Sequence, residues 1–133
     1  MSQENVEIIR RALAAFSQGD VGVLAQAIDP DITVYPRPAE PDAAAKYQGL
    51  DGLEEYTMNW YSQWEVYETE PVEIIDAGEH VLAVLRERGR AHGTGVEVVQ
   101  DFTHSFVLRD GKIMEWHMYD SHADALEAVG LSE

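Results

Sequence analysis

The chain has 133 residues, no cysteine, and a formal net charge of −16 that comes from 25 acidic and 9 basic residues. This length suits one domain, residues 1–133, with its own hydrophobic core. Without cysteine there can be no disulfide, thiolate nucleophile or Cys-bound metal. A surface this negative repels phosphate backbones and anionic lipid, so we expect no nucleic-acid or membrane partner. No apolar run is long enough to span a bilayer, and the N-terminus lacks the pattern of a secretion signal, so we expect a cytoplasmic protein.

The first third of the chain has the periodicity of helices. Apolar residues recur at spacings of three and four along the first predicted helix: Val6, Ile9, Leu13 and Phe16. Gly19 is expected to end this helix, and Asp20 to cap a short second helix that runs to Ile28. A short strand is predicted over residues 32–35.

Residues 36–49 contain several prolines, which remove backbone donors and predict an irregular loop. A loop of this length is either a binding loop or lid, or a surface excursion without a role. A third helix is predicted from Asp51, with large side chains on one stripe: Leu53, Tyr56, Trp60 and Trp64. Such a stripe packs into a core or lines a ligand pocket, and we take Tyr56, Trp60 and Trp64 as candidate substrate-binding residues.

The second half of the chain changes to β-branched and aromatic residues broken by turns, which is typical of an antiparallel meander. Strands are predicted over residues 66–75, 80–92, 96–108 and 113–119, followed by a short helix over residues 123–129. Helices followed by consecutive strands predict an α+β fold, in which helices cover one face of an antiparallel sheet.

Two tight turns predict the register of this meander. Asp110-Gly111 is a strong two-residue hairpin signal, and counting back from it places His104 opposite His117. A second turn around Gly93 to Gly95 adds Arg86 to the same face. The predicted pocket face then reads Leu82, Val84, Arg86, Phe102, His104, Phe106, Glu115, His117 and Tyr119. Trp116 falls on the opposite face, which we expect to be a subunit interface of a homodimer. A bulge in either long middle strand would shift these pairs.

The composition of the predicted pocket face suggests general acid–base chemistry on a small apolar carbonyl compound. Two imidazoles, His104 and His117, titrate near neutral pH and can move a proton. Arg86 can stabilise an enolate, and Tyr35 can donate a hydrogen bond from the rim. Further candidates for substrate contact are Phe102, Phe106 and Tyr119. No cofactor or metal is expected.

Two other interpretations stay open at this point. The histidines can be plain cross-strand neighbours in a protein that binds a hydrophobic ligand without chemistry. They can also form a metal site with Glu115, although a carboxylate two residues from His117 is poorly placed for it.

Several short strings, in this order and spacing, resemble the superfamily of nuclear transport factor two, and within it the SnoaL-like and ketosteroid isomerase-like proteins. They are Phe16-Ser17-Gln18-Gly19-Asp20, Asp29-Pro30-Asp31-Ile32-Thr33-Val34, Tyr47-Gln48-Gly49, Arg109-Asp110-Gly111-Lys112-Ile113 and Ala125-Leu126-Glu127-Ala128-Val129-Gly130-Leu131. The resemblance implies a cone: a curved antiparallel sheet and three helices around an apolar pocket, often in a homodimer. It leaves the chemistry open, because this fold hosts isomerases, cyclases, dehydratases, epoxide hydrolases and non-enzymes.

The isomerase residues of that family are not retained here. Their positions fall at Ala12, at Pro36 beside Tyr35, and at His104, so isomerisation by that mechanism is not expected. SnoaL-like cyclases resemble the chain better, because their histidine matches His104. Their aspartate position falls at His117 or Met118, and the nearest carboxylate is Asp120. An epoxide-hydrolase triad would need Asp101, Asp120 and Arg86 on one face, which the predicted register does not give.

Overall fold

The computed structural model describes residues 2–40 and 43–131, so Pro41 and Asp42 of the proline-rich loop lie outside the described residues. The helices are α1 (Ser2–Gln18), α2 (Val21–Gln26), α3 (Gly49–Tyr61) and α4 (His122–Ala128). The strands are β1 (Ile28–Tyr35), β2 (Tyr47–Gln48), β3 (Trp64–Ala77), β4 (His80–Ala91), β5 (Glu97–Arg109) and β6 (Lys112–Met118). These elements match the predicted ones in type and order, with ends that differ by a few residues, except that the short strand β2 lies in the segment predicted to be an irregular loop.

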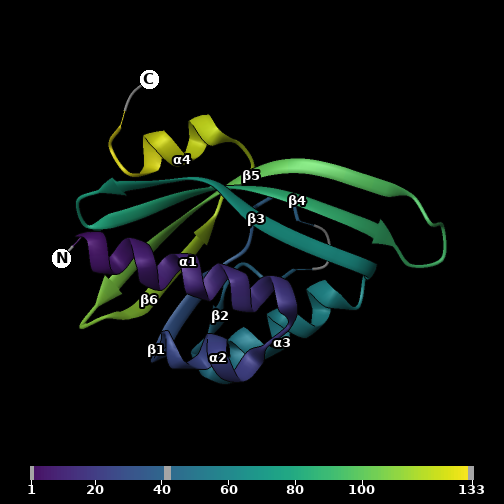
Figure 1. Cartoon of the computed structure of the whole chain (residues 1–133), viewed down its shortest axis with the longest axis horizontal. Coiled ribbons are helices and arrows are strands. Elements are labelled where there is room, and N and C mark those ends of the chain that lie inside the picture. Colours follow the sequence, from purple (N-terminus) through teal and green to yellow (C-terminus); the bar gives the residue numbers. More distant parts are fainter. Residues whose placement is uncertain (1, 41–42, 132–133) are drawn as a thin grey trace.

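The strands form one curved six-stranded sheet in the order β2-β1-β6-β5-β4-β3 (Figure 1). All neighbours are antiparallel except β1 and β6, which run parallel. Helices α1, α2 and α3 lie on one side of the sheet, and α4 lies on the other (Figure 1). We call these sides the inner and the outer face. This is the predicted cone-like α+β fold, but the prediction that the helices cover one face holds for α1, α2 and α3 and not for α4.

The hairpin at Asp110 and Gly111 forms as predicted, because both residues have positive φ, 53° and 76°. Arg109 pairs with Lys112, and Leu108 with Ile113. Beyond these pairs the register shifts, because Met114 is an extra residue in β6, and Val107 pairs with Glu115. This β-bulge places every later residue of β6 on the face opposite to the predicted one.

The β4–β5 hairpin differs from the prediction by one residue as well. Ala91 donates its backbone N–H to the Val96 carbonyl at 3.0 Å, so the loop spans residues 92–95 and not residues 93–95. Ala83 therefore pairs with His104, and Arg86 with Asp101. The ladder between these strands is regular, so the loop length and not a bulge causes the shift.

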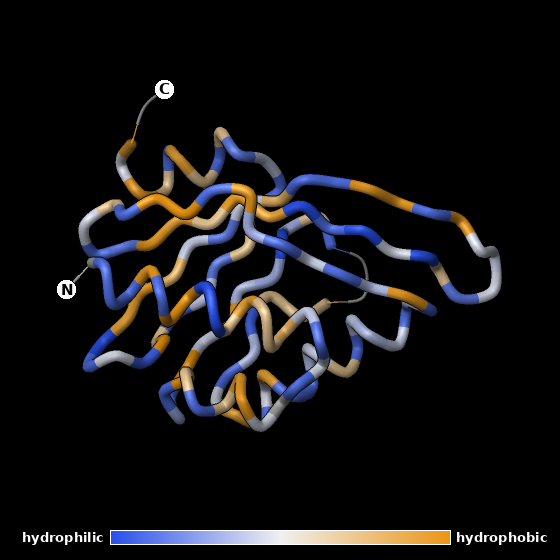
Figure 2. The backbone as a smooth tube through the Cα atoms, viewed as in Figure 1, coloured by the Kyte–Doolittle hydropathy of each residue, from blue (hydrophilic) through white to orange (hydrophobic). Residues whose placement is uncertain are grey.

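The main core lies between the inner face and the helices. Ile9, Leu13 and Phe16 of α1 are buried in it, as their spacing predicts. A smaller cluster on the outer face joins Leu82 to Ala125 and Leu126 of α4. Figure 2 shows that β4 is hydrophobic in its first half and hydrophilic in its second, where the strand leaves the core. Among the described helices, none has the length and apolar character needed to cross a membrane.

Candidate functional site

The inner face changes character along β4. Val81, Ala83 and Leu85 are buried apolar residues of this face, and Glu87, a residue that is only 7% exposed, continues their alternation. A carboxylate loses its hydration on burial, so its position needs compensating partners or a function. The site is built around this residue.

An aromatic pocket of about 210 Å³ opens beside Glu87, between the end of α3, the second half of β4 and the first half of β5. Its lining residues are Arg37, Trp60, Gln63, Trp64, Tyr67, Glu87, Arg88, Gly89, Val98, Gln100 and Phe102. Aromatic walls with a few polar groups are typical of small-molecule sites. The volume is below the roughly 300–1,000 Å³ of most ligand pockets, so the pocket suits a small compound.

A much smaller void of about 10 Å³ lies directly behind this pocket. The two spaces share Arg37, Trp60, Tyr67, Glu87 and Phe102 as lining residues. The void alone is also lined by Phe16, Glu40, Tyr56, His104 and Met118. Glu87 is therefore the carboxyl group that borders both spaces.

Burial raises the pKa of the Glu87 carboxyl from 4.5 to about 7. The Tyr67 hydroxyl and the Arg37 charge act in the opposite direction, and the Glu40 carboxylate adds to the rise. A carboxyl group with a pKa near neutral pH can both accept and donate a proton under ordinary conditions.

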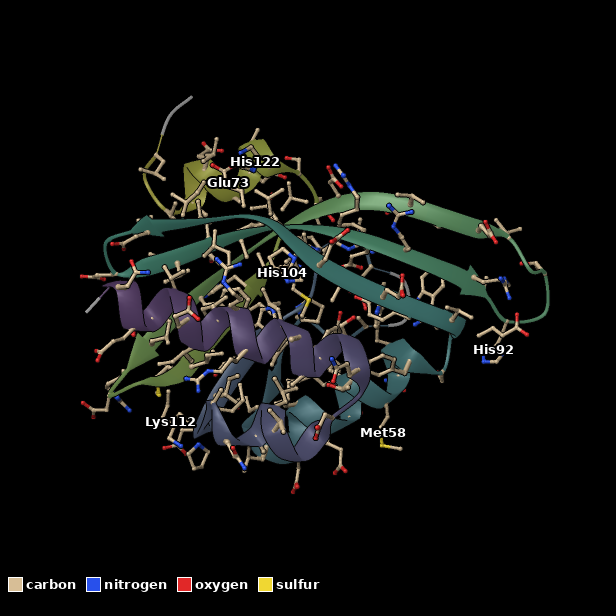
Figure 3. The ribbon with its side chains drawn as sticks, in the orientation of Figure 1. Met58, Glu73, His92, His104, Lys112 and His122 are labelled. Atoms are coloured by element: carbon tan, nitrogen blue, oxygen red, sulfur yellow. The ribbon has the colours of Figure 1, made fainter. Side chains whose placement is uncertain are left out.

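His104 lines the void from β5 and is held in one tautomer. The Trp116 indole donates its Nε1–H to His104 Nδ1 at 3.0 Å, so in the neutral ring the proton is on Nε2. Burial, with a further contribution from Arg37, lowers the pKa of His104 to about 3. The ring is therefore a neutral N–H donor at physiological pH and not a general base. Figure 3 shows His104 in the middle of the molecule, in contrast to His92 at the hairpin tip.

The proline-rich loop supplies two charged groups to the site. The Arg37 guanidinium lies 4.7 Å from the centre of the Phe102 ring and 3.8 Å from an Asp120 carboxyl oxygen. Glu40 is 8% exposed, and the Tyr56 hydroxyl donates to its Oε1 at 3.0 Å. Burial raises the pKa of Glu40, while Tyr56 and Arg37 lower it. Asp120 also accepts the Ala39 backbone N–H at 3.2 Å, which fixes the loop on the sheet.

Gly89 shapes the pocket wall through the absence of a side chain. A Cβ atom at this position would lie 2.5 Å from Trp64 Cε3, well inside van der Waals contact. The Trp64 indole therefore lies flat against the β4 backbone, where it forms the outer wall of the pocket.

The structure does not bring the predicted catalytic residues together. The bulge at Met114 turns His117 to the outer face, where its ring stacks on Tyr35 at 4.3 Å and its Nε2 bonds to Glu115 Oε1 at 2.8 Å. Arg86 is also on the outer face, in an ion pair with Asp101 at 3.0 Å. The prediction that His104, His117 and Arg86 share one cavity is therefore wrong. So is the proposed metal set of His104, His117 and Glu115, and the described residues hold no other His, Asp or Glu cluster suited to a metal.

The remaining predicted residues divide between the two faces. Trp60, Trp64 and Phe102 line the pocket, and Tyr56 lines the void. Three other predicted residues line neither the pocket nor the void: Phe106 is in the core, and Tyr35 and Tyr119 flank His117 on the outer face. Trp116, expected at a subunit interface, is buried against Phe16 of α1.

Sequence reasoning missed Glu87, Glu40, Arg37 and Tyr67. For Glu87 a signal was present, because a charged residue in phase with Val81, Ala83 and Leu85 marks a polar group on an apolar face. The loop residues Arg37 and Glu40 carry no periodic signal, and only their place in a predicted binding loop pointed to them.

Comparison with known proteins places the chain in a family. A family model described as a SnoaL-like domain matches residues 9–116. No curated protein matches the chain.

Many solved structures share the fold. TerC, co-crystallised with polyporic acid, is 20% identical at a TM-score of 0.79, with 96% of this chain and 98% of that chain covered. A candidate polyketide cyclase from Sinorhizobium meliloti is 24% identical at a TM-score of 0.68, with 84% and 93% covered. A protein of ketosteroid isomerase-like fold from Catenulispora acidiphila, bound to trimethylamine, is 18% identical at 0.74, with 95% and 94% covered.

Proposed function

The chain belongs to the SnoaL-like domain family, and within it we propose that this protein is an enzyme that moves a proton on a small carbonyl compound by general acid–base catalysis. The observation that carries the proposal is the buried Glu87 carboxyl group on the wall of the aromatic pocket, with a pKa of about 7. TerC binds polyporic acid, and another structural neighbour is a candidate polyketide cyclase, which agrees with a substrate that carries carbonyl groups.

In this proposal the substrate ring lies between the aromatic walls of the pocket, and its carbonyl oxygen points toward the void. Glu87 as carboxylate takes a proton from the carbon next to the carbonyl group, and the oxygen gains negative charge as the enolate forms. The Nε2–H of His104 and the positive charge of Arg37 stabilise this oxygen. For isomerisation, the Glu87 carboxylic acid then returns the proton to another carbon of the enolate system. For cyclisation, the enolate carbon first attacks a second carbonyl group and closes the ring, and Glu87 gives its proton to the alkoxide oxygen that this attack forms.

Trp116 is a positioning residue in this scheme. Its indole N–H occupies His104 Nδ1, which keeps the other nitrogen protonated and directed away from Trp116.

The test follows exchange of the acidic C–H of probe compounds, cyclic enones and hydroxylated quinones, in D₂O by proton NMR. The unchanged protein should accelerate exchange, and Glu87→Gln should slow it by about 10²-fold or more, the usual contribution of a general base. The control is His117→Ala on the outer face, which should exchange at the unchanged rate. Equal exchange in Glu87→Gln and the unchanged protein would refute the role of Glu87.

The second candidate is a non-catalytic protein that binds a hydrophobic ligand, and the small volume of the void favours it because little of a ligand can reach His104. A probe that quenches Trp60 and Trp64 fluorescence without any exchange would support this candidate.

We also propose a homodimer, now through the outer face. Tyr35, His117 and Tyr119 form a half-exposed ring stack there, which would be covered by a second copy. Sedimentation equilibrium tests this: a dimer that Tyr35→Ala weakens supports the interface, and a monomer at micromolar concentration contradicts it.

A further inference from the structure

The void behind the pocket has the size of one water molecule. Its volume of about 10 Å³ is close to the minimum that a single buried water needs. Such a water normally makes about three hydrogen bonds to buried polar groups. The void meets this condition, because Glu40, Glu87 and His104 all line it.

The hydrogen-bond partners of Glu40 and His104 leave one position available on each of these two groups. Glu40 Oε1 accepts from Tyr56, so its second carboxyl oxygen is available. His104 Nδ1 accepts from Trp116, so the Nε2–H is the available donor. Before the carbonyl oxygen of a substrate approaches His104, or after it leaves, a water that accepts from the His104 Nε2–H can donate its two hydrogens to Glu40 and Glu87.

We propose that the void binds one water molecule between Glu40 and Glu87, and that Glu40 receives protons from Glu87 through it. In this step the Glu87 carboxylic acid gives its proton to the water, and the water gives one of its own protons to the Glu40 carboxylate. Glu87 ends as a carboxylate, Glu40 as a carboxylic acid, and the water is unchanged. The inference rests on the proposed function, since it explains how Glu87 returns to its basic form when a substrate does not take the proton back.

The position of Glu40 suits this role. It lines the void but not the pocket, so it does not belong to the walls that hold a bound substrate. It also belongs to the loop that Asp120, just after the end of β6, holds in place by accepting the Ala39 backbone N–H at 3.2 Å.

Other groups set the charge around Glu87 and enter any titration of it. They are Arg37 and Glu40 of the loop, Tyr56 and Tyr61 of α3, Tyr67 of β3 and His104 of β5. The change of Glu40 to Gln removes a negative charge and leaves the others in place, and it preserves an oxygen that can accept from Tyr56.

Two measurements without any substrate test the proposal. The first is a high-resolution crystal structure of the unchanged protein, in which we expect a water within hydrogen-bond distance of both carboxyl groups. An empty void between well-ordered side chains would overturn the proposal.

The second is a carbon-13 NMR titration of the glutamate carboxyl groups, with Glu87→Gln used to assign the Glu87 signal. In Glu40→Gln the pKa of Glu87 should fall, because the negative charge of Glu40 no longer raises it and residue 40 can no longer take up a proton from the shared water. The matched control is Glu73→Gln, which removes an exposed carboxylate on β3 and should leave the titration unchanged. An unchanged Glu87 titration in Glu40→Gln would overturn the proposal while leaving the role of Glu87 as base intact, because that role is measured by substrate exchange.

Discussion

The inner and outer faces of the sheet hold two histidines in opposite environments. On the inner face His104 is 5% exposed, accepts the Trp116 N–H and has its pKa lowered to about 3 by burial. On the outer face the His117 side chain is 27% exposed and bonds to the carboxylate of Glu115. The first is a fixed neutral donor in a core, and the second is a partly exposed ring in contact with a carboxyl group. Only the histidine on the inner face, His104, is therefore placed to act in the buried site.

One residue causes this separation. Without the bulge at Met114, regular pairing from the Asp110-Gly111 turn would bring His117 to the inner face and Trp116 to the outer one. The bulge exchanges them, so the large indole fills the core and also orients His104. The comparison teaches that the register of β6 sets both the packing and the chemistry of the inner face.

The largest effect is expected from deletion of Met114, which removes the bulge. His117 and Glu115 would turn toward the core, and Trp116 toward solvent, so the inner face would lose its largest buried side chain. We expect no cooperative unfolding transition in urea followed by tryptophan fluorescence. A deletion variant that unfolds cooperatively with an unchanged midpoint would contradict the importance of the bulge.

The two histidines themselves give the next comparison. His104→Ala leaves a hole in the core and the Trp116 N–H without an acceptor, and should lower the free energy of unfolding by roughly 2–4 kcal/mol. His117→Ala removes a half-exposed ring and should cost less than about 1 kcal/mol. Urea unfolding of both variants measures the difference, and equal losses would mean that the two faces are not distinct.

A pH-dependent effect distinguishes Glu87 from exposed carboxylates. Its pKa is about 7 in the folded protein against 4.5 for an ordinary glutamate, so the folded state binds more protons than the unfolded state between these values. This contribution to stability is present at low pH and is lost as the pH rises from about 4.5 through 7. Glu87→Gln has no carboxyl group to ionise, so it does not lose stability in this pH range. Above pH 7 it should be more stable than the unchanged protein, by about 3 kcal/mol at most.

The measurement is the unfolding midpoint in urea at several pH values. Glu73→Gln is the control on the outer side of the molecule, where a change within about 0.5 kcal/mol is expected at every pH. If the gain of Glu87→Gln were the same at pH 5 as above pH 7, burial of the charge would not be its cause.

Much of the fold could be predicted from the sequence, because its signals are local. The apolar spacing of Ile9, Leu13 and Phe16 indicated α1, and Asp110-Gly111 indicated the last hairpin together with its first two pairs. The site could not be derived in the same way. Register propagates along a strand, so the extra residue at Met114 and the longer loop at residues 92–95 each reversed a face, and neither leaves a compositional trace.

Some site residues were still found despite the wrong register. Phe102 and His104 of β5 were assigned to the pocket side, and they line the pocket and the void, because the error moved the neighbouring strands and not β5 itself. Trp60 and Trp64 were found from helix periodicity, although Trp64 belongs to the beginning of β3. Glu87 was missed because the shifted β4 register assigned it to the other side.

The missing side chain at Gly89 gives the protein a simple means of changing which compounds fit. Because Trp64 rests on bare backbone, a single methyl group at residue 89 would displace the indole and so change the shape of the pocket that it lines. The choice of compounds that fit the pocket can thus evolve at this position alone, with Glu87, His104 and Arg37 left as they are.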